Sequence, residues 1–165
     1  MASFESYANK YKSVRMERRD GILQMTLHSD GGPLRWGFLP HGELPEAFYD
    51  VGSDYENKVV IITGTGGEFS GPRATPGTSS FPTRPSIERI DRIHWEGRHL
   101  LMKLLEIEVP VISAINGPAW RHSEIPLLCD TCSQPIQRSS RTRRTLPRMW
   151  CPATACTSSI RFCSA

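Results

Sequence analysis

The 165-residue sequence predicts an α/β fold built from parallel βαβ units. Two short runs rich in β-branched residues, 59–63 and 109–115, have the composition of buried strands. The segment between them, 86–107, carries apolar residues at helical spacing. Because a helix joins the two strands, we expect strands at 59–63 and 110–115 to lie parallel and adjacent, with a right-handed crossover.

A β-hairpin is expected near the start of the chain. Residues 14–17 and 22–28 alternate between apolar and polar side chains, which is typical of strands with one buried face. Asp20-Gly21 lies between them and is a strong signal for a tight hairpin turn.

The following segment predicts a loop and then a short helix. Gly31-Gly32-Pro33 opens the loop, which carries Leu34 and Trp36. Residues 43–51 are expected to form an amphipathic helix with Pro45 in its first turn, where proline is tolerated. Its core-facing side chains are expected to be Leu44, Ala47 and Phe48.

The strand at 59–63 ends in Gly64-Thr65-Gly66-Gly67. This is a weak signal for a dinucleotide-binding fold, because the third glycine and a directly following helix are missing. A segment rich in Gly, Pro, Ser and Thr then runs to Pro85 and predicts a mobile loop. Ser86 is expected to cap the helix at 86–107. The apolar stripe of that helix consists of Ile87, Ile90, His94, Leu101, Leu104 and Leu105.

The stretch 109–126 combines a strand, a tight turn and a helix start. The strand breaks at Asn116-Gly117-Pro118, where glycine allows unusual φ/ψ angles and proline fixes φ. A helix is expected to restart at His122-Ser123-Glu124. Such a turn can aim backbone N–H groups at a developing negative charge, although a plain strand-to-helix connection has the same pattern.

The chain has two compositions, with a boundary near Asp130. Residues 131–165 contain six of the 20 basic residues and none of the 17 acidic ones, so residues 1–130 carry a net charge of −3. Four of the five cysteines also lie in 131–165. We therefore expect one domain over 10–130 and a basic tail over 131–165.

The sequence contains no Walker lysine and no HExxH motif, and Cys129-x-x-Cys132 has no second cysteine pair. We therefore expect no cofactor and no metal. No apolar run approaches the roughly 18 residues that span a membrane, and the N-terminus does not resemble a signal peptide. These observations predict a cytoplasmic protein with no membrane partner.

Several segments resemble one enzyme family. Residues 56–71 (ENKVVIITGTGGEFSG) and 108–120 (EVPVISAINGPAW), with the helix between them, resemble the N-terminal half of the crotonase (enoyl-CoA hydratase/isomerase) superfamily. Residues 34–44 (LRWGFLPHGEL) and 115–126 (INGPAWRHSEIP) most resemble its 6-oxocamphor hydrolase branch of β-diketone hydrolases. The resemblance implies a crotonase-like spiral of ββα repeats, usually a homotrimer, with two backbone N–H groups forming an oxyanion hole.

The resemblance also implies roles for individual residues. One oxyanion-hole N–H is expected near Arg73 and the other at His122, where the family usually has the middle glycine of a Gly-Gly-Gly run. In the diketone hydrolase branch, the side chains at the places of His122 and Trp36 contact the substrate carbonyl. Ile125 stands where hydratases have their first catalytic Glu, and we expect Glu124 to point elsewhere. The implied reaction is retro-Claisen hydrolysis of a small cyclic β-diketone, with acyl-CoA hydration or isomerisation as the alternative.

Residues 131–165 show no periodicity and resemble nothing in the family, so we expect this tail to be disordered. One interpretation is a basic arm that binds nucleic acid. We favour a shifted reading frame and expect no nucleic-acid partner, because the neighbouring frame over 132–145 and 151–157 permits segments that the diketone hydrolase pattern expects. A frame-shifted tail would leave a truncated and inactive remnant, without the helices that form the family's trimer.

Overall fold

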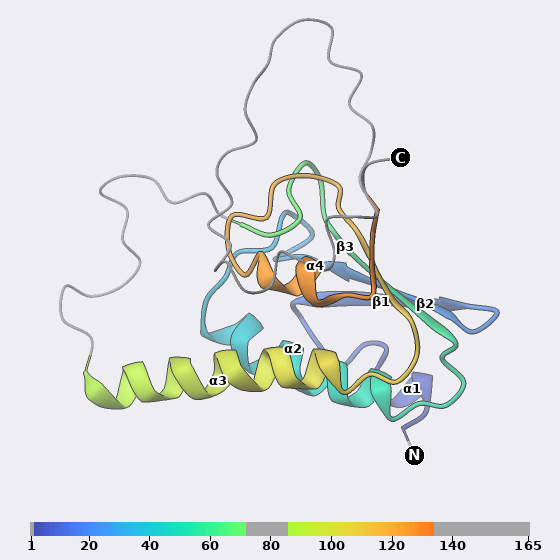
Figure 1. Ribbon diagram of the computed structural model, residues 1–165, viewed down its shortest axis with the longest axis horizontal. Coiled ribbons are helices and arrows are strands. Elements are labelled where there is room, and N and C mark those ends of the chain that lie inside the picture. The colour runs from blue at the N-terminus through green and yellow to red at the C-terminus, as the bar shows by residue number, and fades with distance from the viewer. Residues whose placement is uncertain (1, 72–85, 134–165) are drawn as a thin grey trace, which may run out of the picture.

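The computed structural model describes residues 2–71 and 86–133 of the chain. The expected loop over 72–85 and the tail beyond Ser133 lie outside these residues. The order of elements is α1 (Phe4–Tyr7), β1 (Val14–Arg19), β2 (Ile22–Leu27), α2 (Phe38–Gly52), β3 (Val59–Gly64), α3 (Ile87–Leu105), β4 (Val111–Ala114), α4 (Glu124–Leu128) and β5 (Thr131–Ser133). Figure 1 shows α2 and α3 side by side below a twisted sheet.

The sheet contains β1 to β5 in chain order and confirms the α/β prediction. Strands β1 and β2 pair antiparallel around Asp20 and Gly21, whose φ angles of 53° and 81° fit the expected hairpin turn. Strands β2, β3 and β4 then pair parallel, with Val60 beside Val111 in the register. The prediction that 59–63 and 110–115 form adjacent parallel strands is therefore confirmed.

The sheet includes one strand beyond the expected boundary near Asp130. Thr131–Ser133 forms β5, which pairs parallel to β4. The carboxylate of Asp130 accepts a hydrogen bond from the backbone N–H of Val111 at 2.8 Å, and the N–H of Ile115 donates to the carbonyl of Ser133 at 2.8 Å. These bonds on either side of the strand pair add β5 to the sheet although its three residues bury little apolar surface.

Helix α2 begins five residues earlier than the composition predicts. Its first residue is Phe38, so Pro45 lies in the helix interior and not in the first turn. The core-facing residues are nevertheless the expected Leu44, Ala47 and Phe48, all completely buried. Burial of this face stabilises a helix whose first turn has poor intrinsic propensity.

Helix α3 begins at the expected cap, where the Ser86 hydroxyl accepts a hydrogen bond from the backbone N–H of Arg89. The predicted stripe is only partly correct. Leu104 is buried together with Leu100, whereas Ile87 is 77% exposed. Two further members of the stripe, Ile90 and Leu105, are also exposed. The apolar surface of α3 is wider than its contact with the rest of the fold, so part of it meets no other element among the described residues.

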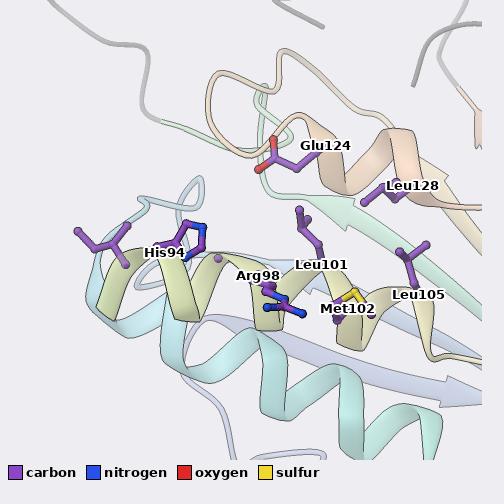
Figure 2. A pocket seen from close by; sticks show the side chains of 9 residues that line it. His94, Arg98, Leu101, Met102, Leu105, Glu124 and Leu128 are labelled. Atoms are coloured by element: carbon purple, nitrogen blue, oxygen red, sulfur yellow. The ribbon is translucent and has the colours of Figure 1, made fainter. Parts of the chain in front are cut away.

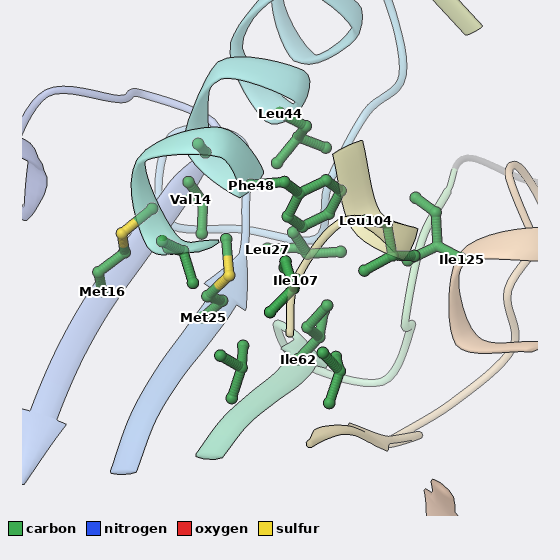
Figure 3. Packing of buried hydrophobic residues seen from close by; sticks show 14 of the residues in the cluster. Val14, Met16, Met25, Leu27, Leu44, Phe48, Ile62, Leu104, Ile107 and Ile125 are labelled. Atoms are coloured by element: carbon green, nitrogen blue, oxygen red, sulfur yellow. The ribbon is translucent and has the colours of Figure 1, made fainter. Parts of the chain in front are cut away.

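The core lies between the sheet and the two long helices. Figure 3 shows Phe48 of α2 above Leu27 and Ile62 of the sheet, with Leu104 of α3 and Ile125 of α4 at one side. Each of these side chains is at most 2% exposed. Within the described part of the chain, no helix is long and apolar enough to cross a membrane.

Candidate functional site

The loops that follow the three parallel strands β2, β3 and β4 meet at the carboxyl edge of the sheet. The loop after β2 bonds to the loop after β3, since the N–H of Trp36 donates to the carbonyl of Gly71 at 3.1 Å. The loop after β3 bonds to the loop after β4, since the N–H of Trp120 donates to the carbonyl of Ser70 at 2.8 Å. Carboxyl ends of parallel strands are the usual place for ligand sites in α/β folds.

The turn at Asn116-Gly117-Pro118 forms as expected, but glycine is needed for a different reason. A Cβ atom at Gly117 would lie 2.0 Å from the carbonyl oxygen of Gly67. The residue does not adopt a left-handed φ, so close approach of two loops explains the glycine, not the unusual φ/ψ that the sequence predicted. The side chain of Asn116 accepts from the N–H of Gly64 and donates to the carbonyl of Gly66, which fixes the two loops together.

His122 occupies the place where the resemblance implies a glycine, and its backbone is glycine-like. Its φ is 49°, in the left-handed region that few side chains adopt. The ring turns back toward the start of α4, where Nδ1 lies 2.7 Å from Oε1 of Glu124. The left-handed turn therefore brings the ring of His122 to the carboxylate of Glu124, a contact that the sequence analysis does not predict.

A second histidine, which the sequence analysis did not single out, completes this group. His41 is the fourth residue of α2, and its Nε2 lies 2.8 Å from Nε2 of His122. Its Nδ1 lies 2.8 Å from the carbonyl oxygen of Gly37. The only indication of a role for His41 in the sequence is its position within the LRWGFLPHGEL segment, seven residues after Leu34, because this segment carries part of the family resemblance.

The hydrogen-bond partners determine where protons lie on the two rings. A carbonyl oxygen and a carboxylate only accept, so Nδ1 of His41 donates to Gly37 and Nδ1 of His122 donates to Glu124. The two Nε2 atoms then face each other at 2.8 Å, and a hydrogen bond between them requires one additional proton. The pair therefore holds one shared proton when both outer hydrogen bonds are made.

The two neighbours of His122 in this group, His41 and Glu124, both have a lowered pKa. Burial lowers the pKa of His41, and the nearby His122 lowers it further, while the carbonyl of Gly37 opposes the shift. The hydrogen bond from His122 lowers the pKa of Glu124 against the effect of its burial. These shifts favour the ionised form of Glu124 and the neutral form of His41.

Trp36 lies against both histidines. Its ring centroid is 4.0 Å from that of His122 and 5.1 Å from that of His41. The indole Nε1 of Trp36 is buried and has no hydrogen-bond partner among the described residues. An unpaired buried donor is costly, which makes this N–H a candidate for binding a ligand oxygen.

An open groove of about 510 Å³ adjoins this group, with Glu124 on its wall. The remaining lining comes mainly from α3, including Leu101 and Leu105, and from Leu128 of α4. Figure 2 shows Leu101 pointing from α3 toward α4. The groove therefore places apolar surface next to the carboxylate that holds His122.

The structure thus brings together two of the predicted site residues, Trp36 and His122, and adds His41 and Glu124. The third, Arg73, lies outside the described residues. Within residues 2–71 and 86–133 no group of three or more His, Cys, Asp or Glu side chains is placed to hold a metal ion. A tertiary contact between α2 and the loop before α4 creates the histidine pair, and residues 81 positions apart give no local sequence signal for it.

Comparison with solved structures identifies similar folds. The chain is similar to a β-diketone hydrolase from the cyanobacterium Anabaena sp. PCC 7120 bound to (S)-3-oxocyclohexyl acetic acid, with 38% identity and a TM-score of 0.69 over 78% of this chain. It is also similar to an enoyl-CoA hydratase/isomerase from Mycobacterium paratuberculosis (18% identity, TM-score 0.61) and an enoyl-CoA hydratase from Bacillus anthracis (19% identity, TM-score 0.60), each over 74% of this chain. The last two likenesses show the fold alone.

The chain spans about half the length of these solved relatives. It covers 50% of the β-diketone hydrolase, 49% of the mycobacterial protein and 47% of the Bacillus protein. No protein-family profile matches the sequence, and neither does any curated protein.

Proposed function

We propose that this chain, which has the crotonase fold, is a member of the crotonase superfamily and forms the ketone-binding part of a carbon–carbon bond hydrolase that cleaves a cyclic β-diketone. The similarity to a β-diketone hydrolase at 38% identity supports this choice within the superfamily. The observation that carries the proposal is the buried, unpaired indole N–H of Trp36 beside the proton-bearing pair His41–His122.

The proposed reaction is a retro-Claisen hydrolysis. The oxygen of water bonds to one carbonyl carbon, and the bond from this carbon to the carbon between the two ketones breaks. The electron pair of the broken bond passes into the enolate of the second ketone. A proton released by the water converts the enolate to a ketone, and the attacked carbonyl becomes a carboxylic acid. Atoms and electrons balance with water as the only co-substrate.

Donors at a carbonyl oxygen are the main requirement of this reaction, because negative charge develops on oxygen in both halves of the diketone. Trp36 offers an N–H that no other group uses among the described residues, and His122 offers its shared proton at the neighbouring ring. The backbone N–H of His122, and one near Arg73, are the further donors that the resemblance implies. The apolar groove beside Glu124 is suited to the carbon ring of the substrate.

The second candidate, an acyl-CoA hydratase or isomerase, has less support. Ile125 occupies the position where the resemblance places the first hydratase carboxylate, and this side chain is completely buried in the core. Glu124 holds the adjacent carboxylate, but Oε1 is engaged by His122. General acid–base addition of water to an enoyl thioester needs a carboxylate that is free to exchange protons with water.

We further propose that this 165-residue chain is itself inactive, because the family resemblance implies that the base that activates water lies beyond Asp130, and the chain covers only 50% of the β-diketone hydrolase. The shifted reading frame over 131–165 remains our explanation of the tail. The gene sequence tests it: one base inserted or lost near codons 130–132 is the expected result, and an intact frame continuing upstream and downstream would contradict it.

Binding by the chain as it exists tests the ketone site without catalysis. Addition of (S)-3-oxocyclohexyl acetic acid to the ¹⁵N-labelled chain is expected to shift the indole N–H resonance of Trp36, assigned from its loss in the Trp36→Phe variant. The indole signal of Trp95, which is 60% exposed and stacks on His99, is the internal control and should not move. An unmoved Trp36 signal at millimolar ligand would contradict the proposed site.

A further inference from the structure

Both rings of the histidine pair are held by their outer nitrogens. Nδ1 of His41 lies 2.8 Å from the carbonyl oxygen of Gly37, and Nδ1 of His122 lies 2.7 Å from the carboxylate of Glu124. In the neutral form of each ring, Nε2 therefore presents a lone pair. Histidines that bind metals have this arrangement, because an outer hydrogen bond to a backbone carbonyl or a carboxylate fixes the tautomer and the orientation of the ring.

The two Nε2 atoms also have the separation of neighbouring ligands on one metal ion. They lie 2.8 Å apart. Two nitrogens that lie about 2.0–2.1 Å from a divalent transition metal, at right angles to each other, are separated by about 2.8–3.0 Å. Right angles between neighbouring ligands are typical of the tetragonal geometry of Ni²⁺ and Cu²⁺, and imidazole suits both ions. Tetrahedral Zn²⁺ would need a separation of about 3.3–3.4 Å and fits less well.

The surroundings of the pair suit a cation from solution. The side chains of His122 and Glu124 are 21% and 42% exposed, so the site is not sealed from solvent. Burial lowers the pKa of His41, which favours the neutral ring that a metal requires. The hydrogen bond from His122 lowers the pKa of Glu124, so that one negative charge lies beside the site.

We propose that Nε2 of His41 and Nε2 of His122 form a binding site for a tetragonal divalent transition-metal ion such as Ni²⁺ or Cu²⁺. The ion takes the place of the shared proton. Because the described residues place no group of three or more ligands here, water completes the coordination. The ion is an inhibitor of the proposed reaction and not its cofactor, since His122 can then no longer donate the shared proton to a carbonyl oxygen. The inhibition rests on the proposed function, whereas the binding of the ion does not.

Titration of the untagged, ¹⁵N-labelled chain with Ni²⁺ locates the site without a keto acid. Six-coordinate Ni²⁺ is paramagnetic and broadens the signals of nearby protons. The ring centroid of Trp36 lies 4.0 Å from that of His122 and 5.1 Å from that of His41, so the indole N–H signal of Trp36 should broaden first. The indole signal of Trp95 detects binding at another histidine, because Trp95 stacks on His99 at 4.2 Å.

Matched variants show whether the pair holds the ion. His122→Asn keeps a residue that tolerates the left-handed φ of 49°, and His41→Gln keeps a polar side chain on α2. Each should weaken Ni²⁺ binding, measured by calorimetry, by more than about tenfold, and Glu124→Ala should weaken it by about tenfold as an outer-shell partner. His99→Gln and Mg²⁺ are the controls: the variant should bind Ni²⁺ like the wild type, and Mg²⁺, which prefers oxygen ligands, should not bind.

The comparison stays decisive if one variant does not fold, because the two histidines and Glu124 are tested separately. The cysteines are the same in every variant, so any Ni²⁺ that they bind cancels. Unchanged Ni²⁺ affinity in folded His41→Gln or His122→Asn, or bound Ni²⁺ that broadens Trp95 and leaves Trp36 sharp, would overturn the proposal. Because no keto acid is present, a chain that fails to bind it can still give either result.

Discussion

Replacement of Trp36 by phenylalanine separates a donor role from a packing role. Trp36→Phe keeps an aromatic ring against His122 and removes the indole N–H. An unpaired buried N–H costs about 1–3 kcal/mol, so its removal is expected to raise the free energy of unfolding. The smaller ring buries less surface, and a loss of roughly 40 Å² costs about 1 kcal/mol. These terms oppose each other, so we expect the free energy of unfolding to change by no more than about 1 kcal/mol.

The same substitution is expected to lower kcat of the frame-restored enzyme by about 10²–10³-fold, the usual effect of removing one oxyanion donor. Urea unfolding of the 165-residue chain and diketone turnover by the restored enzyme measure the two effects. Trp95→Phe, at a 60% exposed side chain, is the matched control and should change neither. A stability loss above about 2 kcal/mol in Trp36→Phe would show that the N–H has a structural partner, and unchanged turnover would show that it is no donor.

Three further outcomes are expected. Gly117→Ala should destabilise the chain by about 1–3 kcal/mol in urea unfolding, because its Cβ would meet the carbonyl of Gly67, and an unchanged midpoint would refute the close approach of these loops. Gly97→Ala on α3, where a Cβ meets nothing within 4 Å, should instead stabilise by about 0.5–1 kcal/mol, and a loss of stability there would place a neighbour against α3. The hydrogen bond from His122 lowers the pKa of Glu124, so ionised Glu124 contributes to the free energy of unfolding above the unfolded pKa near 4.5. This contribution is lost as the pH falls through the lower pKa of the folded chain. The free energy of unfolding of the wild type should therefore exceed that of Glu124→Gln by less than about 1 kcal/mol above pH 5, since the Glu124 side chain is 42% exposed. The two values should be equal near pH 3, and a difference that grows on acidification would contradict the lowered pKa of Glu124.

The strands and the hairpin could be predicted because their signals are local. Asp20-Gly21 determines a tight turn through backbone preferences. The β-branched runs over 59–63 and 109–115 form adjacent strands in which buried residues alternate with partly buried ones. A segment whose structure is determined by one local preference can therefore be predicted from its sequence. The same holds for Ser86, whose side chain caps α3 as its position implied.

The errors have causes that lie in tertiary structure. The start of α2 at Phe38 was missed because Pro40 and Gly42 lower helix propensity, which packing of the helix against the sheet and α3 overrides. Only part of the apolar stripe on α3 is buried, because periodicity locates an apolar face but does not tell which part of a wide face meets the rest of the fold.

The candidate site was predicted only in part for a related reason. Trp36 and His122 came from a family resemblance, and the structure shows their rings 4.0 Å apart. Glu124 enters the group because the left-handed backbone of His122 turns the histidine ring toward it, and this backbone conformation cannot be read from the sequence. His41 joins the group through a contact between α2 and the loop before α4, and contacts between distant segments leave no local pattern.

Turnover of a bicyclic 1,3-diketone by the frame-restored enzyme, compared with hydration of a crotonyl thioester, is the measurement that bears most directly on the proposed carbon–carbon bond hydrolase. We expect diketone cleavage to dominate, and His122→Ala to lower its kcat by about 10²–10³-fold because a donor at the developing oxyanion is lost. The 165-residue chain should turn over neither substrate. Faster hydration than cleavage in the restored enzyme, or diketone cleavage by the 165-residue chain above its own His122→Ala control, would contradict the proposal.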